Sequence, residues 1–310
     1  MNFLVTGAAG LIGSNIALML QESGKVLALD DLSAGKKENL NAFKGEFIRE
    51  DVRFCDYFRY APKLEAIFHQ AAITDTTVMD VALMDSVNVE AFRKLLIFAL
   101  KIGCRKIVYA SSAAVYGKGK VPMRETDIPA PANVYGESKV KMEAVAREFI
   151  KENPGFSVVG LRYFNVYGPG EFHKNKFASM IYQLYLQMAS GKNPRIFKWG
   201  AQFRDFIYVK DVVAANLKAF ERDVRGAFNV GTGKPNTFNK VIESLNKAIG
   251  KNFKPEYFDN PYGFYQDQTQ ADMALSSSTL GFEAAYSLEN GIKEYVQILE
   301  GRGHTLEPVS

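Results

Sequence analysis

The feature that most constrains the fold is a glycine-rich turn near the start of the chain. A short apolar run leads into three glycines at the spacing G-x-x-G-x-x-G, and an apolar run with helical periodicity follows. In a strand, turn and helix of this kind, Gly7 permits a tight turn, Gly10 lets backbone approach a pyrophosphate, and Gly13 lets the helix pack close to the strand. The N-terminus of the helix, at Leu11 and Ile12, then faces the phosphates. The motif predicts a dinucleotide site, although a glycine-rich turn alone is also typical of an ordinary turn.

The second apolar run, residues 26–29, ends in an acid that strengthens this interpretation. Asp30 stands where an acidic side chain binds a ribose hydroxyl in dinucleotide-binding folds, and Asp31 is a further predicted cofactor contact. An acid at this place favours an unphosphorylated ribose. Lys36 and Lys37 follow within reach, however, and could neutralise a 2′-phosphate. Both NAD and NADP therefore stay open on these residues.

Short β-branched runs alternate with helical stretches over the first half of the chain. This alternation predicts a Rossmann-type, doubly wound parallel sheet of the α/β class, with ligands at the carboxyl ends of its strands. After residues 165–170 the pattern breaks into a loop, a helix expected over 177–189 and shorter mixed elements. We expect a dinucleotide domain over residues 1–165, to which the chain returns between about 205 and 235, and a smaller C-terminal substrate-binding lobe over 166–310. The expected strands are Phe3–Val5, Val26–Leu29, Glu46–Arg49, Ala66–His69, Lys106–Ala110 and Ser157–Arg162.

Composition excludes several broad classes of protein. Among the 310 residues, 47% are hydrophobic and 23% are charged, as in globular chains, and no apolar run approaches the ~18 residues of a membrane span. Because no basic segment precedes the first strand, we expect no signal peptide, and because the cysteines suggest no disulfide framework, we expect a reducing cytoplasm as the location. Cys55 and Cys104 do not suggest a disulfide framework and are best explained as small core residues. A net charge of +4 from scattered lysines fits an anionic small molecule better than nucleic acid, and we expect neither a membrane partner nor a metal.

Two further strand ends complete the predicted cofactor site. Asp51, followed by Val52, ends the third strand and can accept from an adenine amine, while a solvated turn acid is the alternative. After the fourth strand come the small residues Ala71 and Ala72, where we expect the backbone to pass close to the pyrophosphate and the nicotinamide ribose. His69, which ends that strand, is better explained as an oriented structural histidine than as a catalyst. The other predicted contacts are Gln70, Ala71, Ala72 and Asn88.

A tyrosine and a lysine at helical spacing suggest the chemistry. Tyr135 and Lys139 stand at i and i+4, on one face of the expected helix. A phenol, with a free pKa of about 10, is a poor base at neutral pH. A neighbouring ammonium and the positive nicotinamide of an oxidised cofactor would lower that pKa, and Lys139 can also hold the nicotinamide ribose. Ser112, after the fifth strand, can bond to a substrate oxygen, so we predict a catalytic triad of Ser112, Tyr135 and Lys139.

These residues resemble the extended short-chain dehydrogenase/reductase family, which acts on nucleotide sugars, and the resemblance covers nearly the whole chain. The two residues after Ser112 discriminate within the family. Dehydratases carry Asp-Glu there to eliminate water, whereas this chain has Ala113 and Ala114. The resemblance therefore implies oxidation followed by re-reduction, without elimination.

Other segments resemble the ADP-glyceromanno-heptose 6-epimerases of that family, namely residues 68–72, 76–77, 162–174, 178–180, 203–206 and 265–272. By this resemblance Lys174 is a second catalytic acid/base. The resemblance also implies tightly bound NADP and a cytoplasmic homo-oligomer, a pentamer, that serves lipopolysaccharide core biosynthesis. The substrate contacts that it implies are Asn165, Val166, Lys174, Lys176, Phe197, Arg204 and Tyr265.

A physical reason supports a second base. Inverting an exocyclic carbon through an aldehyde needs rotation about one C–C bond, after which the oxygen faces a different wall of the pocket. A different proton donor must wait there, whereas a ring 4-epimerase turns the whole sugar and can use one tyrosine for both faces. Lys174 is the candidate, with a solvated loop lysine as the alternative. Arg204 is a candidate diphosphate ligand because its guanidinium matches phosphate oxygens, and a surface arginine is the alternative.

The chain departs from the family at two places. Asp31 stands where many members have Asn, which weakens the case for NADP as the cofactor in preference to NAD. Residues 198–202 differ from the usual substrate loop and include Trp199, which could stack on a base or a sugar or pack between the lobes. The nearest rival function is a UDP-hexose 4-epimerase that uses NAD, and a non-catalytic NAD(P)-sensing protein is a rival from another class.

Overall fold

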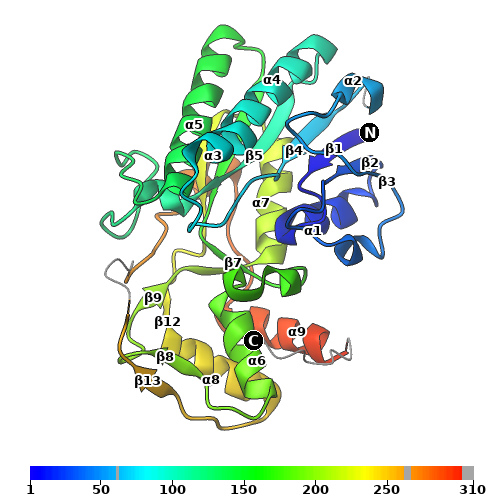
Figure 1. The fold of residues 1–310 in the computed structure, drawn as a ribbon. Coiled ribbons are helices and arrows are strands. Elements are labelled where there is room, and N and C mark those ends of the chain that lie inside the picture. Colours follow the sequence, from blue (N-terminus) through cyan, green and yellow to red (C-terminus); the bar gives the residue numbers. More distant parts are fainter. Residues whose placement is uncertain (61–62, 262–266, 302–310) are drawn as a thin grey trace.

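A seven-stranded parallel sheet forms the centre of the computed structural model, which describes residues 1–60, 63–261 and 267–301 (Figure 1). The strand order is β11-β6-β5-β4-β1-β2-β3, so the chain winds outward from β1 in both directions. The predicted Rossmann-type α/β fold is confirmed. The strands are β1 Asn2–Thr6, β2 Lys25–Leu29, β3 Glu46–Ile48, β4 Ala66–His69, β5 Lys106–Ser112, β6 Ser157–Tyr163 and β11 Gly226–Val230.

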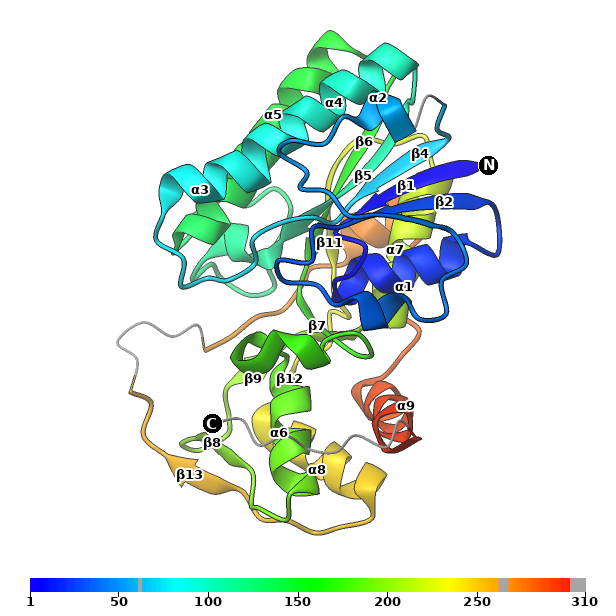
Figure 2. The ribbon, with the colours of Figure 1, turned by 45° about the vertical axis from the view of Figure 1, so that its right-hand side comes forward.

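Helices cover both faces of this sheet (Figures 1 and 2). Alternate residues of β1 explain why, since Phe3 and Val5 enter one apolar core while Leu4 enters the other. The first core lies under α1 Leu11–Leu20 and α7 Val209–Glu221. The second core lies under α4 Ala91–Ile102 and α5 Val134–Glu152. Three short helices border these layers, namely α2 Tyr57–Tyr60, α3 Val81–Asp85 and the π-helical turn Ser86–Glu90.

All six strands expected from the sequence lie where they were predicted, within two residues at each end. β11 is a seventh strand of the sheet, and it pairs with β6 after the chain has left the sheet for α6 and α7. The return of the chain between residues 205 and 235 is thus part of the sheet topology, while the domain boundary at residue 165 stays a prediction.

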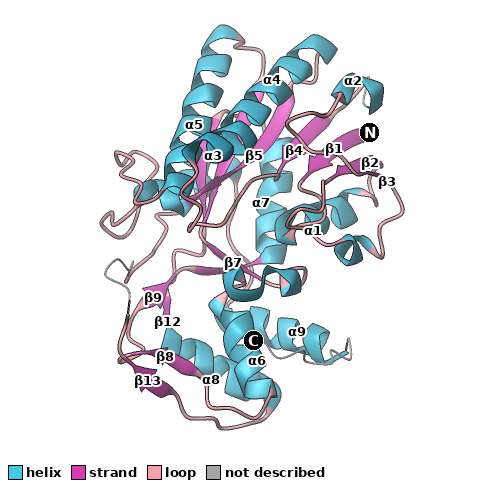
Figure 3. Ribbon diagram, in the orientation of Figure 1, coloured by secondary structure: helices cyan, strands magenta, loops and turns pink. Residues whose placement is uncertain are grey.

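A smaller lobe lies against the carboxyl edge of the sheet (Figure 2). Its own core packs α6 Met180–Ala189, α8 Phe238–Ile249 and α9 Leu288–Gly301 around apolar side chains such as Ile181 and Leu245. Figure 3 shows that its strands are short and form two-stranded pairs. These pairs are β7 Asn165–Tyr167 with β10 Phe206–Tyr208, β9 Phe203–Arg204 with β12 Asn236–Thr237, and β8 Arg195–Phe197 with β13 Glu256–Phe258.

The helix expected over 177–189 begins later than predicted, at Met180. Ser179 is the reason, because its hydroxyl accepts from the Tyr182 N–H and caps the helix. The residues before it, Phe172–Phe177, form a separate 3-10 helix. Along the described ranges, none of the helices is both long enough and apolar enough to cross a membrane.

Candidate active site

The glycine turn joins β1 to α1 at the carboxyl edge of the sheet. Gly7 has φ +65°, and a Cβ there would lie 2.5 Å from the Ala71 nitrogen. A Cβ on Gly13 would overlap the carbonyl of Gly7, so both glycines permit the approach of α1 and β4 to the turn. Gly10 is the N-cap of α1 and has no side chain to bind the N–H groups of the first turn. This helix end is thus built to meet an anion, as a pyrophosphate site requires.

Asp30 follows β2 and is held by the glycine turn itself. Its Oδ2 accepts from the Ala9 N–H at 2.9 Å, and its Oδ1 accepts from the Leu32 N–H at 2.8 Å. Burial raises the pKa of this carboxyl, and the two backbone bonds oppose the rise. A buried carboxylate fixed beside the turn fits the ribose-binding role predicted for Asp30.

Lys37 and Asp31 make local contacts beside Asp30. The Lys37 ammonium lies 3.4 Å from the centroid of the Phe47 ring, in a cation–π contact. Asp31 accepts from the N–H and the hydroxyl of Ser33. Asp51, expected to bind adenine, forms an ion pair of 2.6 Å with Arg53, which lowers the pKa of its carboxyl. Val52 is buried in the core of the sheet.

The residues after β4 are tied to the rest of the site by amide side chains. The Gln70 Oε1 accepts from the Tyr163 hydroxyl at 3.1 Å. Asn88 accepts from the Ile73 N–H and donates to the Ser138 hydroxyl, so the chain that passes Ala71 and Ala72 is fixed against α5.

His69 has the surroundings of a structural histidine. Its Nδ1 lies 2.7 Å from the Thr6 hydroxyl, its ring stacks on Phe92, and burial lowers its pKa to about 3. The imidazole is therefore neutral at neutral pH. His69 is fully buried, pairs with Thr6 between β4 and β1, and is not among the residues that line the cavity described below.

Tyr135 and Ser112 meet at a cavity of about 210 Å³. Asn133 caps α5 by accepting from the Gly136 N–H. A Cβ on Gly136 would lie 2.7 Å from the Ala114 oxygen, so the first turn of α5 packs directly against the segment after β5. The Ser112 hydroxyl accepts from the Ala114 N–H at 3.1 Å and bonds to the Tyr135 phenol. The other residues that line the cavity are Thr76, Ala113, Ala114, Gly117, Ala132, Asn133, Tyr163, Phe164, Asn165 and Thr269.

Lys139 lies one turn behind Tyr135 and is fully buried. Its Nζ donates to the Ala110 carbonyl at 2.8 Å and lies 5.7 Å from the centroid of the Tyr135 ring. Burial lowers the pKa of the Lys139 ammonium to about 7, and the negative charge of Glu143 opposes this. Lysine and tyrosine thus share one helix face, as their spacing predicts.

The electrostatics of Tyr135 differ from the expectation that a neighbouring ammonium lowers its pKa. Burial raises the pKa of the phenol, and the hydrogen bond with Ser112 opposes that rise. A lysine with a pKa of about 7 carries its full charge only below neutral pH, which limits its effect on the phenol. The contribution of an oxidised nicotinamide to this pKa stays a prediction.

The predicted substrate contacts of the second lobe have varied surroundings. The Asn165 Oδ1 accepts from the Thr269 hydroxyl at 2.9 Å, and both residues line the cavity. Val166 pairs with Ile207 between β7 and β10. Arg204 is only 8% exposed and donates to the Phe203 carbonyl, so the surface-arginine interpretation is wrong.

The 3-10 helix Phe172–Phe177, which follows β7, carries Lys174, which is half-buried and does not line the cavity. Burial lowers the pKa of its ammonium, and the nearby Glu171 carboxylate opposes the change. The solvated loop lysine is therefore not what the structure shows. The Phe197 ring packs edge-on against Phe258. The Lys176 side chain and Tyr265 lie outside the described residues.

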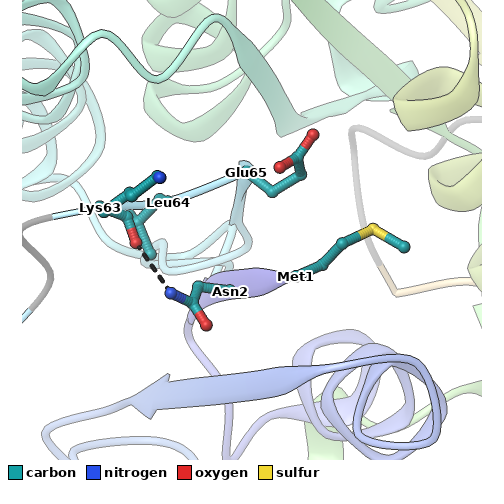
Figure 4. A pocket seen from close by; sticks show the side chains of 5 residues that line it. All are labelled: Met1, Asn2, Lys63, Leu64 and Glu65. Atoms are coloured by element: carbon teal, nitrogen blue, oxygen red, sulfur yellow. Dashed lines mark hydrogen bonds between the residues drawn. The ribbon is translucent and has the colours of Figure 1, made fainter.

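A second hollow, of about 320 Å³, lies at the opposite end of the sheet, between the starts of β1 and β4. Figure 4 shows its lining, where Asn2 donates to the Lys63 carbonyl at 3.3 Å. Its two charged side chains, Lys63 and Glu65, belong to exposed residues. Over the described ranges, no cluster of His, Cys, Asp and Glu side chains could hold a metal ion.

Comparison with known proteins identifies the family. The model of the NAD dependent epimerase/dehydratase family matches residues 3–231. The chain belongs to this family. It is 39% identical to the ADP-L-glycero-D-manno-heptose-6-epimerase of Brachyspira hyodysenteriae, over 97% of this chain and 98% of that protein.

Two solved structures are similar to this family member over nearly their whole length. The Helicobacter pylori ADP-L-glycero-D-manno-heptose-6-epimerase has a TM-score of 0.88 and 40% identity, with 96% of each chain covered. The Thermotoga maritima UDP-glucose 4-epimerase, solved with UDP-glucose, has a TM-score of 0.89 and 34% identity, with 97% of this chain and 99% of that chain covered. Both the predicted activity and its nearest rival therefore occur among the relatives of this epimerase/dehydratase chain.

A buried ion pair that was not predicted from the sequence supports the candidate active site of this family member. Glu143 binds Arg162 through two hydrogen bonds of 2.8 and 2.7 Å and also accepts from the Ser111 hydroxyl at 2.7 Å. Arg162 continues the network to the Tyr116 hydroxyl. The sequence does contain a signal for this pair, because Glu143 stands eight residues after Tyr135 and four after Lys139, on the same buried face of the helix.

We expect Gly13→Ala to abolish dinucleotide retention and to destabilise the fold by about 1 to 3 kcal/mol, because the added methyl group overpacks the turn. Thermal unfolding and mass spectrometry of released dinucleotide measure the two effects. Gly155→Ala is the matched control, since a Cβ at Gly155 meets nothing within 4 Å. A Gly13→Ala protein with unchanged stability and cofactor content would contradict this account of the turn.

We expect Glu143→Gln to move the pH limb caused by deprotonation of Lys139 to lower pH. The carboxylate raises the pKa of Lys139, so its neutral amide lowers that pKa from about 7. The pH profile of kcat measures the shift, which a purely structural loss would not produce. Arg147→Gln, which removes an exposed charge 3.9 Å from the same carboxylate, is the control and should leave the limb in place. If the limb caused by deprotonation of Lys139 lay at the same pH in the Glu143→Gln protein and in the parent, the result would contradict the effect of Glu143 on the pKa of Lys139.

Proposed function

We propose that this chain is an ADP-L-glycero-D-manno-heptose 6-epimerase, which inverts C6 of its nucleotide-sugar substrate by transient oxidation and re-reduction. The observation that carries the proposal is the meeting of Tyr135 and Ser112 at a cavity that Asn165 of the second lobe also lines. Ala113 and Ala114, in the places of the dehydratase acids, line the same cavity and leave elimination without its acid and base. Whole-length identities of 39% and 40% with two proteins of this name support the substrate.

The residues present fit a dinucleotide cofactor, which the family description names as NAD. Gly7, Gly10 and Gly13 form the pyrophosphate cradle, and Asp30 faces the position of the adenosine ribose. When bound, the nicotinamide supplies the acceptor and the donor of the C6 hydride. We propose NADP, with Lys36 and Lys37 as ligands of its 2′-phosphate, and keep NAD as the alternative that Asp30 and Asp31 favour. Weighing the dinucleotide released by denaturation distinguishes the two.

Tyr135 carries the first proton transfer in this proposal. Its Oη takes the proton of the C6 hydroxyl while the Ser112 Oγ bonds to the same oxygen and orients it. Lys139 holds the nicotinamide ribose and, through its charge, favours the phenolate. Asn165, which lines the same cavity, positions the sugar.

Lys174 is the proposed second acid/base. After rotation of the aldehyde its oxygen faces another wall, and the half-buried Lys174 ammonium, whose pKa is lowered, can exchange a proton with it more readily than an ordinary lysine. Because Lys174 does not line the cavity, its role depends on the family resemblance and on the rotation argument.

The alternative is a UDP-hexose 4-epimerase, favoured by the 34% identity with the Thermotoga maritima enzyme. The pentameric homo-oligomer, the cytoplasmic location and the part in lipopolysaccharide core biosynthesis remain predictions of the resemblance. Gel filtration with light scattering tests the first of these.

We expect the purified protein, with its dinucleotide, to convert ADP-heptose of one C6 configuration into a mixture of both. Proton NMR follows the conversion, and Tyr135→Phe should lower kcat by about 10²- to 10⁴-fold, the usual size of acid–base catalysis. ADP-heptose that keeps its C6 configuration, together with turnover of UDP-glucose, would transfer the assignment to the alternative.

We expect Lys174→Ala to lower kcat for heptose inversion by about 10²-fold or more, since the rotated oxygen then lacks its proton donor. Lys192→Ala, at an exposed lysine beyond α6, is the matched control and should keep normal turnover. Near-normal inversion by Lys174→Ala would mean that Tyr135 serves both faces, as in a single-base 4-epimerase.

A further inference from the structure

An asparagine on α1 reaches across to the loop after β7, which lies beside this helix (Figures 1 and 2). The Asn15 Nδ2 donates to the Leu11 carbonyl of its own helix at 2.7 Å and to the Pro169 carbonyl of the loop at 2.8 Å. A carbonyl oxygen can only accept a hydrogen bond, so these two partners fix Nδ2 as the end of the amide that faces them. One hydrogen of the amide thus binds the helix and the other binds the loop.

A second asparagine repeats this arrangement one residue further along the loop. Asn39, in the 3-10 helix Lys37–Leu40, donates from Nδ2 to the Ala9 carbonyl of the glycine turn at 2.8 Å and to the Gly170 carbonyl at 2.9 Å. The same nitrogen lies 3.4 Å from the His173 Nδ1. The Asn39 Oδ1 is buried and has no hydrogen-bond partner among the described residues, so the two carbonyls set the orientation of this amide.

The loop packs directly on the first turn of α1. Gly170 has φ +104°, and a Cβ there would lie 3.3 Å from the Ser14 Oγ and 3.5 Å from the Leu11 Cα. This turn of the helix is the one expected to face the pyrophosphate. The loop therefore contacts the elements that form the predicted cofactor site.

The next residue of the loop anchors it to the smaller lobe. Glu171 is fully buried, and its carboxylate accepts from the N–H groups of Gly168 at 3.1 Å and of Ser179, the N-cap of α6, at 2.6 Å. Its carbonyl accepts from the Lys174 N–H at 2.9 Å. Residues 169–171 are thus held from both lobes, and the backbone of Lys174 is bonded to the last of them.

We propose that Asn15 and Asn39 are positioning residues for Lys174, which tie the second acid/base to the turn that binds the dinucleotide. This inference rests on the proposed function, in which Lys174 gives a proton to the rotated oxygen. The aldehyde carbon takes back the hydride while its oxygen takes that proton, so the nicotinamide and Lys174 must lie at a defined distance from each other. The two amides set this distance between the lobes, and a misplacement of about 1 Å can cost about 10²-fold in rate.

The carbonyls on the sheet side of each amide have other donors. The Ala9 carbonyl also accepts from the Lys36 N–H at 3.0 Å, and the Leu11 carbonyl accepts from the Ser14 hydroxyl at 3.3 Å. Alanine in place of either asparagine should therefore release the loop and leave the glycine turn intact. We expect both variants to keep their dinucleotide, as weighed by mass spectrometry after denaturation. A loss of activity that followed a loss of dinucleotide would overturn the proposal.

We expect Asn15→Ala and Asn39→Ala each to lower kcat for heptose inversion by about 10-fold or more, and to have no further effect in the Lys174→Ala protein. A general loss of stability would lower turnover in both backgrounds. Asn41→Ala, at an exposed asparagine that ends the same 3-10 helix, is the matched control and should keep normal turnover. Parent-like turnover of both variants, or a loss of equal size with and without the Lys174 side chain, would overturn the proposal.

Hydrogen exchange separates this inference from the proposed function. In the dinucleotide-loaded protein, we expect the N–H groups of residues 168–174 to exchange about 2- to 10-fold faster in Asn15→Ala and Asn39→Ala than in the parent, the effect of losing one hydrogen bond. Asn41→Ala should exchange like the parent. Unchanged exchange in both variants of an active epimerase would reject the positioning role and keep the proposed function. Faster exchange in a protein without epimerase activity would keep the positioning role and reject the proposed function.

Discussion

The buried ion pair between Glu143 and Arg162 is the interaction on which the geometry of the active site depends. The residues are 2% and 4% exposed, respectively, so neither charge can turn to water if the other is removed. The pair joins α5 to β6, and the Ser111 hydroxyl adds β5. These elements carry Tyr135 and Lys139 on the helix and Ser112 at the end of β5. Breaking such a pair by removing one partner costs about 3 to 5 kcal/mol, which keeps the helix in one position on the sheet.

The two lobes are joined by a second buried carboxylate. Asp205 accepts from the N–H groups of Thr232, Gly233 and Ala271, which belong to the segments that follow β11 and precede the last helix. Burial raises the pKa of this carboxyl, and the hydrogen bonds oppose the rise. Because the Asp205 carbonyl also accepts from the Asn165 N–H, this one residue ties a residue of the cavity lining to the segment after β11. The predicted substrate contact Asn165 is thereby tied to the segments that pack beside the central sheet.

Local pattern explains how much of this could be predicted from the sequence. The strands, the glycine turn and the spacing of Tyr135 and Lys139 depend on periodicities of two and 3.6 residues and on glycine spacing, which are readable over a dozen residues. The contacts of Asp51 with Arg53, of Lys37 with Phe47 and of Glu143 with Arg162 depend on which side chains the finished fold brings together. The direction of the pKa shift of Tyr135 was missed for the same reason, since burial is a property of the whole structure.

The hydrogen on C6 of the sugar provides the most direct test of the central claim, which is that one closed site at the edge of the sheet removes and returns a hydride. The measurement uses ADP-heptose with deuterium at C6, the dinucleotide-loaded protein and ordinary water, with mass spectrometry and NMR of the product. We expect the inverted product to keep its deuterium. An inverted product that has exchanged its deuterium for solvent hydrogen would contradict oxidation and re-reduction at this site.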